Sequence, residues 1–358
     1  MNVNEYDVLV VGAGVIGLAS AFELGHRGFR VAIFDENIGT GSSFAAAGMI
    51  APSAEVSPEH REFTKNSVAS RNEWPQFAQK VTTSSDIEIQ LHVTGSLFVG
   101  WDSSDRREHE RYFSMANAQG FPFEVVSRDL DEGRFQCIAS SVRRGHFVSD
   151  DAHVDVEKVL AALCEANRRF GADFISETAT ECLTDSDGVR VVVPSGEFRA
   201  RRGIIANGYS AVEPKILRLS HNKIRPIRGI SLRLRLRIDS PSPVPMIRGL
   251  VHGRIVYAVY RNDGVVIVGA SSDESAEREI ESGVVRRLLE DVTTLIPSLD
   301  RASFLEARVG LRPASSTHNP FFERIDNGPW AWSNGYFRHG YLMAPLAAQL
   351  AANFVEEN

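Results

Sequence analysis

The chain has 358 residues, of which 43% are hydrophobic and 24% charged, and its formal net charge is -7. This length allows two domains or one large one, and the composition is that of an ordinary globular protein. There is no basic tract or basic–aromatic run, which argues against nucleic acid as a partner. No uninterrupted apolar stretch approaches the roughly 20 residues that a membrane span needs.

The three cysteines, Cys137, Cys164 and Cys182, lie far apart and form no CxxC pair. This spacing does not fit a disulfide framework or a zinc site, so we expect no metal and a reducing, cytoplasmic location. The apolar residues 8–19 follow Asp7 and have no basic segment before them. They therefore do not read as a secretory signal.

Three glycines stand between the first predicted strand, residues 8–11, and the first predicted helix, residues 15–27. In a GxGxxG motif Gly12 allows a tight turn, Gly14 leaves space for a pyrophosphate, and Gly17 lets the helix pack close to the strand. The free N–H groups at the start of such a helix point toward the phosphates. The motif therefore predicts a dinucleotide site.

The second predicted strand, residues 30–34, ends at Asp35, 18 residues after Gly17. An acidic side chain at this distance accepts hydrogen bonds from ribose hydroxyls. An acid in this place disfavours the 2′-phosphate of NADP, so FAD and NAD both stay open. The alternative interpretation is a Gly-rich turn in an unrelated fold.

The next segment, GTGSSFAAAGMIAP at residues 39–52, consists mostly of small residues. Its backbone can approach a flat ring closely, and Ser42 and Ser43 can bond phosphate or ribose oxygens. From these residues alone, the segment is either a ligand-binding loop or a flexible connection to a helix.

Several segments together make the chain similar to one family. They are AAAGMIAP (45–52), DDAHVDVEKVLAAL (150–163), RRGIIANGYSA (201–211), RPIRGIS (225–231), GLRPASS (310–316) and GYFRHGYLMAP (335–345). In this order they resemble the D-amino-acid oxidase superfamily of flavoproteins, and within it the glycine oxidase branch associated with thiamine biosynthesis. The resemblance runs from about residue 6 to residue 355 and implies FAD as the cofactor.

The resemblance implies a two-domain α/β (α+β) fold, in which a mixed, largely antiparallel substrate-binding sheet is inserted into a Rossmann-type FAD-binding domain and covers the flavin. The FAD-binding domain is expected to be discontinuous, with residues 1–88, 145–215 and 300–358. The substrate-binding domain is expected to take residues 89–144 and 216–299.

The residue pattern adds individual elements to this outline. Apolar periodicity predicts helices at residues 58–80, 156–169 and 276–295, and from about residue 343. Alternating apolar and polar residues predict strands at residues 91–101, 230–238 and 254–270, with hairpin turns at Asp187-Gly188 and at residues 262–264.

The residues that match the family's cofactor-binding segments are expected to contact FAD. They are Gly12, Gly14, Val15, Ile16, Gly17, Asp35, Glu36, Ser42, Ser43, Ala46, Ala47, Gly48, Met49, Thr180, Asn207, Gly208, Arg312, Arg338, His339, Gly340, Tyr341 and Leu342. The cysteine that some sarcosine oxidases use for covalent attachment would follow Arg312. The chain has none there, so we expect non-covalent FAD.

Three residues match the family's substrate-binding positions. Arg312 matches the arginine that pairs with the substrate carboxylate, and a surface arginine at a strand end is the alternative. Arg338 matches a second arginine near the substrate, but it could instead form a salt bridge with a loop. Tyr257 matches a tyrosine whose hydroxyl reaches the carboxylate, whereas Tyr260, three residues on, should point to the other face of the strand.

The resemblance implies oxidation of a small amino acid or related amine by hydride transfer to flavin N5. The imine then hydrolyses to a 2-oxo acid and ammonia, and oxygen takes the electrons and becomes hydrogen peroxide. No general acid or base stands out, and His339 is a structural as much as a catalytic candidate. The N-terminus of the last helix is expected to stabilise negative charge on the reduced flavin.

The chain also departs from the pattern of the glycine oxidase branch. Ile230 replaces a glutamine, Tyr336 a histidine, Asn207 a small residue, and Ser271 and Ser272 a Thr-Met pair. Because Tyr336 and Ser272 are expected near the pocket, glycine, sarcosine, a D-amino acid and a pathway-specific amine all stay open as substrates.

Four functions remain to be distinguished. The first is an oxidase, and the second is a dehydrogenase that passes electrons to a quinone or carrier. The third is a flavoprotein in which FAD only supports the fold, which the presence of Arg312 and Tyr257 disfavours. The fourth, an NAD-dependent dehydrogenase, leaves the C-terminal flavin signature unexplained. The sequence does not decide the oligomeric state, and a homo-oligomer stays open.

Overall fold

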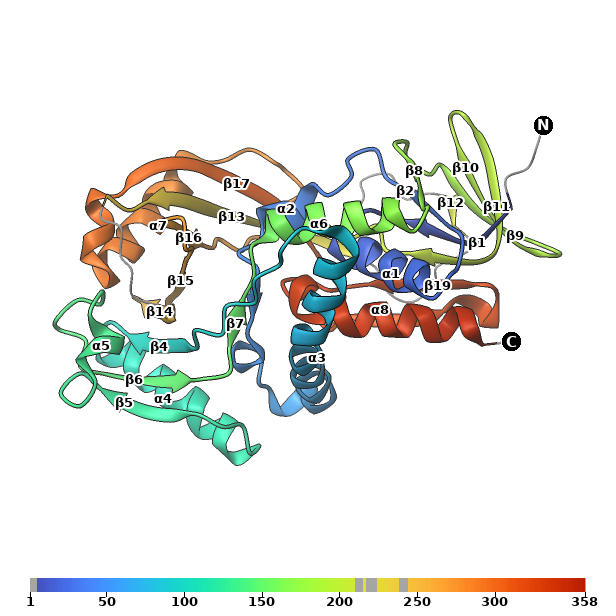
Figure 1. Cartoon of the computed structure of the whole chain (residues 1–358). Helices are drawn as coiled ribbons and strands as arrows, with labels where there is room; N and C mark the ends of the chain where they lie inside the picture. Colours follow the sequence, from blue (N-terminus) through green and yellow to red (C-terminus); the bar gives the residue numbers. More distant parts are fainter. Residues whose placement is uncertain (1–4, 210–214, 217–223, 238–243, 358) are drawn as a thin grey trace.

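The computed structural model describes residues 5–209, 215–216, 224–237 and 244–357. Two large sheets lie side by side, a nine-stranded sheet on the right of Figure 1 and an eight-stranded sheet on the left. A small antiparallel pair, β3 (Met49–Ile50) and β7 (Ala152–His153), belongs to neither. The expected mixed α/β architecture is confirmed.

The nine-stranded sheet has a parallel centre, β8-β2-β1-β11, to which β19 adds in parallel and the β9–β10 hairpin in antiparallel orientation. This arrangement places β1 between β2 and β11, as in a Rossmann-type domain. The strands are β1 (Glu5–Val11), β2 (Val31–Phe34), β8 (Asp173–Ile175), β9 (Glu181–Asp185), β10 (Gly188–Val193), β11 (Gly196–Ile205), β12 (Lys215–Ile216), β18 (Phe321–Arg324) and β19 (Trp330–Asn334).

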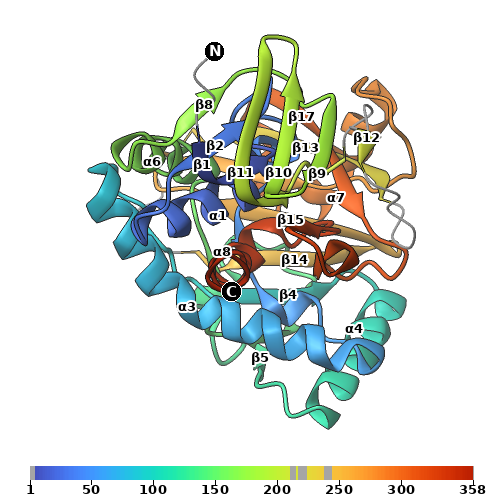
Figure 2. The ribbon, with the colours of Figure 1, turned by 90° about the vertical axis from the view of Figure 1, so that its right-hand side faces the viewer.

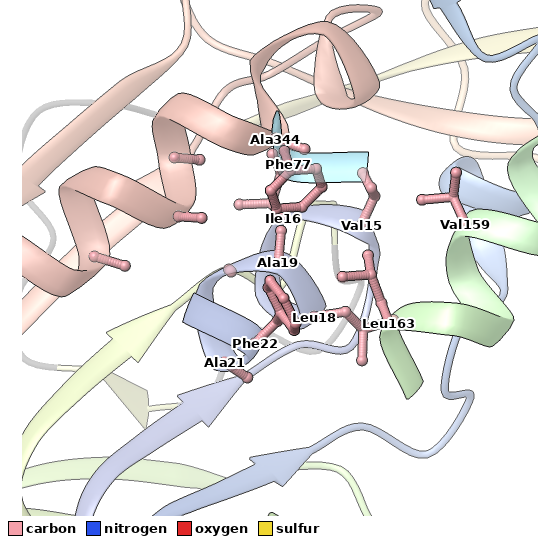
Figure 3. Packing of buried hydrophobic residues seen from close by; sticks show 14 of the residues in the cluster. Val15, Ile16, Leu18, Ala19, Ala21, Phe22, Phe77, Val159, Leu163 and Ala344 are labelled. Carbon is pink, nitrogen blue, oxygen red and sulfur yellow. The ribbon is translucent and has the colours of Figure 1, made fainter. Parts of the chain in front are cut away.

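The helices of this half are α1 (Val15–His26), α2 (Gly41–Ala45), α3 (Arg61–Ser85), α6 (Val156–Arg169) and α8 (Gly340–Glu356). Figure 2 shows α8 lying between α1 and α3. In Figure 3, Phe22 and Leu18 of α1 face Leu163 of α6, and Ala344 of α8 lies close by. All four side chains are buried, so this apolar contact fixes the Gly-rich turn before α1 against the C-terminal helix.

The eight-stranded sheet has the order β17-β13-β16-β15-β14-β4-β6-β5 and is antiparallel except between β14 and β4. Its far face packs on α7 (Ser282–Leu295). The strands are β4 (Ser96–Gly100), β5 (Glu124–Ser127), β6 (Arg144–Val148), β13 (Arg225–Arg235), β14 (Met246–Val251), β15 (Arg254–Tyr260), β16 (Val265–Gly269) and β17 (Ser303–Ala314). The remaining elements are α4 (Ser103–Ala118), α5 (Glu132–Phe135) and the short 3-10 helices Pro52–Ala54, Pro58–His60, Pro297–Arg301 and Ile325–Asn327.

Three helices have boundaries that differ from the sequence prediction by three residues or more. The helix expected at residues 58–80 begins at Arg61 and extends to Ser85, and the last helix begins at Gly340 rather than near residue 343. The helix expected from residue 276 begins only at Ser282. Arg228 explains this delay, because it donates to the Glu279 carbonyl (3.3 Å) and the Glu281 carboxylate (2.5 Å), which holds this exposed segment away from the helix.

The strands cross the expected domain boundaries in two places. β17 pairs with β13 in the eight-stranded sheet, although residues 300–358 were assigned to the FAD-binding domain, and most of β6 lies in the range 145–215. β17 is long enough to pair with β13 and to reach α2 beside the other half. Residues 210–214 and Ile238, which fall in predicted segments, lie outside the described residues, and the domain division stays a prediction.

Within the described part of the chain, no helix has the length and apolar character required to cross a membrane.

Candidate active site

A cavity of about 750 Å³ lies between the two sheets, which is within the usual range of about 300–1,000 Å³ for ligand sites. Most residues predicted to contact cofactor or substrate line it. They are Gly12, Gly14, Val15, Ile16, Asp35, Glu36, Ser42, Ser43, Ala46, Ala47, Gly48, Met49, Asn207, Gly208, Tyr257, Arg312, Arg338, His339, Gly340, Tyr341 and Leu342. Of the predicted set, Gly17 and Thr180 do not line the cavity.

The Gly-rich turn has the tight geometry that the motif predicts. Gly12 has a φ of 107°, and a Cβ on it would overlap the carbonyl of Ala206. A Cβ on Gly17 would overlap the carbonyl of Gly12, so Gly17 lets α1 approach the turn rather than lining the cavity itself. The N–H of Val15 donates to Ser43 Oγ at 3.0 Å. The start of α1 therefore directs its dipole and N–H groups into the cavity.

Asp35 stands at the end of β2 and is held by two backbone donors. Its carboxylate accepts hydrogen bonds from the N–H groups of Ala13 (2.7 Å) and Asn37 (2.8 Å), and its remaining lone pairs are available to a ribose. Thr180 does not line the cavity, and its amide and hydroxyl both bond to the Val192 carbonyl, so its contact with the cofactor stays a prediction. Thr178 lines the cavity in its place.

Two arginines, Arg233 of β13 and Arg261 directly after β15, hold the small-residue loop. Arg233 donates to the carbonyls of Phe44 and Ala46, both at 3.4 Å, and Arg261 donates to that of Ala47 at 2.8 Å. Burial lowers the pKa of Arg233 to about 10, so it stays charged at neutral pH. Neither residue was predicted from the sequence, although Arg233 belongs to the LRLRLR segment, in which basic side chains alternate with apolar ones.

Arg312 extends from β17 over Gly229 of β13. A Cβ on Gly229 would overlap the Arg312 guanidinium, so the glycine provides the space in which this group lies. The guanidinium donates from Nη1 to the Ser271 carbonyl at 3.1 Å, and no described carboxylate lies within 4 Å of it. Burial lowers the pKa of Arg312, but a guanidinium stays protonated in a protein, so its charge lacks a counter-ion.

Tyr257 approaches Arg312 from β15. Its hydroxyl lies over Gly269 of β16, where a Cβ would overlap it. Burial raises the pKa of Tyr257, so the phenol is a neutral hydrogen-bond donor over the physiological range. Tyr260 packs among the apolar residues on the far face of the sheet, whereas Tyr257 packs on the cavity side, which confirms that they point to opposite faces.

Arg338 forms an ion pair with Glu55 at 2.8 Å, which was the alternative interpretation of this residue, and it also lines the cavity. Burial favours the protonated form of Glu55, but the charges of His339 and Arg338 hold its pKa below the ordinary value. Burial lowers the pKa of His339 to about 4, so this imidazole is neutral at neutral pH and packs on Phe63.

The start of α8 presents free backbone donors to the cavity. Gly340, Tyr341 and Leu342 occupy its first turn, and Met343 is the first residue whose N–H bonds back along the helix, to His339 at 2.9 Å. The Tyr341 hydroxyl donates to the Ser43 carbonyl at 3.0 Å and so links α8 to the small-residue loop. The helix dipole therefore favours negative charge at this end of the cavity.

Of the residues that depart from the family pattern, some line the cavity and one lies on the far face of the sheet. Tyr336, Ser272 and Asn207 line the cavity, as expected for the first two. Ile230 is fully buried on the far face of the sheet, and its N–H donates to Ser271 Oγ at 2.9 Å. The loss of glutamine at position 230 therefore does not alter the cavity directly.

The residues that line the cavity fit the chemical groups of FAD. The lining includes Asp35 and the N-terminus of α1, and also Tyr257, Arg312 and the start of α8. These groups suit a ribose, a pyrophosphate and a flat ring in turn. All three cysteines are described and free, and none lines this cavity.

Comparison with known proteins identifies the family. Residues 7–354 match the DAO family, described as FAD dependent oxidoreductase. The chain belongs to this family. It is therefore an FAD-dependent oxidoreductase, which confirms the cofactor and the enzyme class expected from the sequence.

Relatives of this oxidoreductase are named glycine oxidase. The protein of Geobacillus kaustophilus (strain HTA426) is 27% identical over 359 residues, covering 99% of this chain and 93% of the relative. The protein of Bacillus licheniformis is 26% identical over 360 residues, covering 99% and 94%. The crystal structure of glycine oxidase from Geobacillus kaustophilus matches with a TM-score of 0.89 at 26% identity, covering 99% of this chain and 95% of that one. The resemblance to the glycine oxidase branch that the sequence indicated is confirmed.

Three charged residues that line the oxidoreductase's cavity were not predicted from the sequence: Glu55, Arg248 and Arg278. Glu55 follows the small-residue loop, and only its pairing with Arg338 in space marks it out. Arg248 interrupts the apolar strand MIRGLV, and a basic residue in such a strand is a signal that the sequence does carry.

Proposed function

We propose that this oxidoreductase oxidises the C–N bond of a small amino acid or related amine, and that oxygen accepts the electrons. The observation that carries the proposal is the guanidinium of Arg312, which has no carboxylate partner in the described chain and lies beside the neutral hydroxyl of Tyr257 in the cofactor cavity. The glycine oxidase names of the relatives support it independently.

The substrate's carboxylate binds to Arg312, whose planar group bonds both oxygens, while Tyr257 donates a further hydrogen bond. This fixes the α-carbon with its C–H toward the position of the flavin ring. Bound FAD supplies the two-electron acceptor and passes the electrons to oxygen, which yields hydrogen peroxide. The free N–H groups at the start of α8 stabilise negative charge that develops at this end of the cavity.

In the described part of the cavity, Glu55 is paired with Arg338, and neither His339 nor Tyr336 is suited to take a proton from the amine. Burial lowers the pKa of His339 to about 4 and raises that of Tyr336 to about 12, so neither changes protonation between pH 6 and pH 9. The amine therefore reacts as the neutral species present in solution, and positioning and electrostatics supply most of the catalysis. Loss of a hydride and a proton gives an imine, which water converts to a 2-oxo acid and ammonia.

Purified FAD-loaded protein tests this proposal with a panel of glycine, sarcosine, D-amino acids and cyclic amines. The expected result is hydrogen peroxide and 2-oxo acid in equal amounts, with ammonia where the substrate is a primary amine. Dye reduction without peroxide would instead assign the protein to the dehydrogenases.

The remaining expectations about this protein are retained as proposals. The predicted cofactor-contacting residues that line the cavity hold FAD non-covalently, and the two sheets correspond to an FAD-binding and a substrate-binding domain. A cytoplasmic location agrees with the three free cysteines. A homo-oligomer stays open, and size-exclusion chromatography with light scattering decides it.

A further inference from the structure

Arg248 is a second guanidinium in the substrate end of the cavity, and it has no ion-pair partner among the described residues. It stands on β14, directly opposite Tyr257 of β15, and paired residues on neighbouring strands point to the same face of the sheet. Tyr257 is in turn paired with Gly269 of β16, over which its hydroxyl lies. Arg248 and Arg312 therefore reach the cavity from opposite sides of the Tyr257 phenol.

The contacts of Arg248 leave most of its donors unused. Its guanidinium lies 5.5 Å from the ring centroid of Phe98, and Nη1 is 3.7 Å from the sulfur of Met49. A guanidinium carries five N–H donors, and in the described chain none of those of Arg248 bonds to an oxygen atom. Such a group, partly enclosed in a cavity, is arranged to receive an acceptor from outside the chain.

The carboxylates near Arg248 are engaged with other groups and leave it without a close counter-ion. Glu55 and Asp151 attract it through space, yet neither lies within 4 Å of its guanidinium in the described chain. Glu55 is already paired with Arg338, and the Asp151 carboxyl is bound to Ser53 Oγ. A substrate with one carboxylate neutralises Arg312 and leaves the charge of Arg248 without a close partner.

We propose that the preferred substrate carries a second acid group, which Arg248 binds while Arg312 binds the α-carboxylate. The substrate class is thus an amino or imino dicarboxylic acid, with the reacting carbon held under Tyr257. This inference rests on the proposed amine oxidation and adds to it the part of the substrate that the cavity recognises. Arg248 thereby selects among substrates, because the reaction itself needs only the carboxylate bound by Arg312.

The test compares matched pairs of amines on the FAD-loaded protein: sarcosine with iminodiacetate, and D-alanine with D-aspartate. We expect kcat/KM for at least one diacid to exceed that of its partner by tenfold or more. Arg248→Met should reduce this ratio at least tenfold, mainly through KM, and Arg248→Lys should restore part of it. Arg235→Met, which removes an exposed arginine of the same sheet, serves as the control and should keep the ratio.

Two outcomes of the kinetic test would overturn the inference: a ratio of one or less for both pairs, or an Arg248→Met variant with the ratio of the natural chain. In either case the amines are still oxidised, so the proposed function stands. If no amine is oxidised, the proposed function fails instead. The inference is then tested by titrating the flavin absorbance with malonate and with acetate. Malonate should bind at least tenfold more tightly and lose this advantage in Arg248→Met, whereas equal affinities would refute the second acid site.

Discussion

Gly229 allows the position of Arg312 to be tested without removing its charge. A Cβ added at residue 229 would overlap Nη2 and Cζ of Arg312 and would stand 2.7 Å from Nη1. Because ordinary contact between heavy atoms begins at about 3.5 Å and the nearest atom, Nη2, would stand 2.1 Å from the added Cβ, Gly229→Ala requires the guanidinium to move by about 1.4 Å. The move would also weaken the 3.1 Å hydrogen bond to the Ser271 carbonyl.

Gly229→Ala is expected to lower the activity and to leave the stability nearly unchanged. A misplacement of about 1 Å in a substrate-positioning group can lower the rate about 10²-fold, so we expect kcat/KM to fall by that factor. The overlapping atoms are the end of a flexible side chain, so the fold adjusts easily. We expect the melting temperature to change by less than about 1.5 °C, which corresponds to about 1 kcal/mol for a chain of this size.

The assay is steady-state peroxide formation together with thermal unfolding of the FAD-loaded protein. Gly283→Ala on α7 is the control, since the nearest atom to its added Cβ is Arg287 Nη1 at 3.6 Å. Natural kinetics in Gly229→Ala would show that Arg312 does not position the substrate. A large loss of stability would show that the overlap is relieved by the backbone and not by the side chain.

Three further predictions follow from the same site and from a buried acid beside it. Arg312→Ala should weaken carboxylate substrates by about 2–5 kcal/mol, seen in kcat/KM, and near-natural kinetics would remove it from the site. Tyr257→Phe should cost about 1.5–3 kcal/mol through loss of a hydrogen bond to a charged group, whereas Tyr260→Phe on the other face should leave kinetics unchanged; equal effects would contradict the assignment. Burial raises the pKa of Asp151 to about 6, above its ordinary value near 4, so the folded state holds this proton more tightly than the unfolded chain. Its contribution to stability is complete below about pH 4 and is lost as the pH rises to about 6, by about 2–3 kcal/mol. The free energy of unfolding of Asp151→Asn, measured with urea, should not show this loss between about pH 4 and about pH 6. A variant with the same pH dependence as the natural chain would contradict the prediction.

Short-range features of the fold were predictable because neighbouring residues determine them. The Gly-rich turn, α1, β2 and Asp35 depend on glycine positions and apolar periodicity within about thirty residues, and the structure places them as expected. The alternation of Tyr257 and Tyr260 follows from strand geometry in the same way. Local rules thus located the cofactor end of the cavity.

Contacts between distant segments could not be derived from the sequence in this way. The Glu55–Arg338 pair joins residues far apart in the chain, and so do the contacts of Arg233 and Arg261 with the small-residue loop. The late start of α7 depends on Arg228, which lies on another element. Arg248 was overlooked for a different reason: its meaning depends on Tyr257 lying directly opposite it in the sheet.

Anaerobic mixing of the FAD-loaded protein with the amine panel tests the central claim most directly, because it observes the cofactor and the substrate in one step. The proposed function predicts that the yellow colour of the oxidised flavin is lost with at least one carboxylate-bearing amine, and returns when oxygen is admitted. A flavin that stays yellow with every amine, or a purified protein that takes up no FAD, would contradict it.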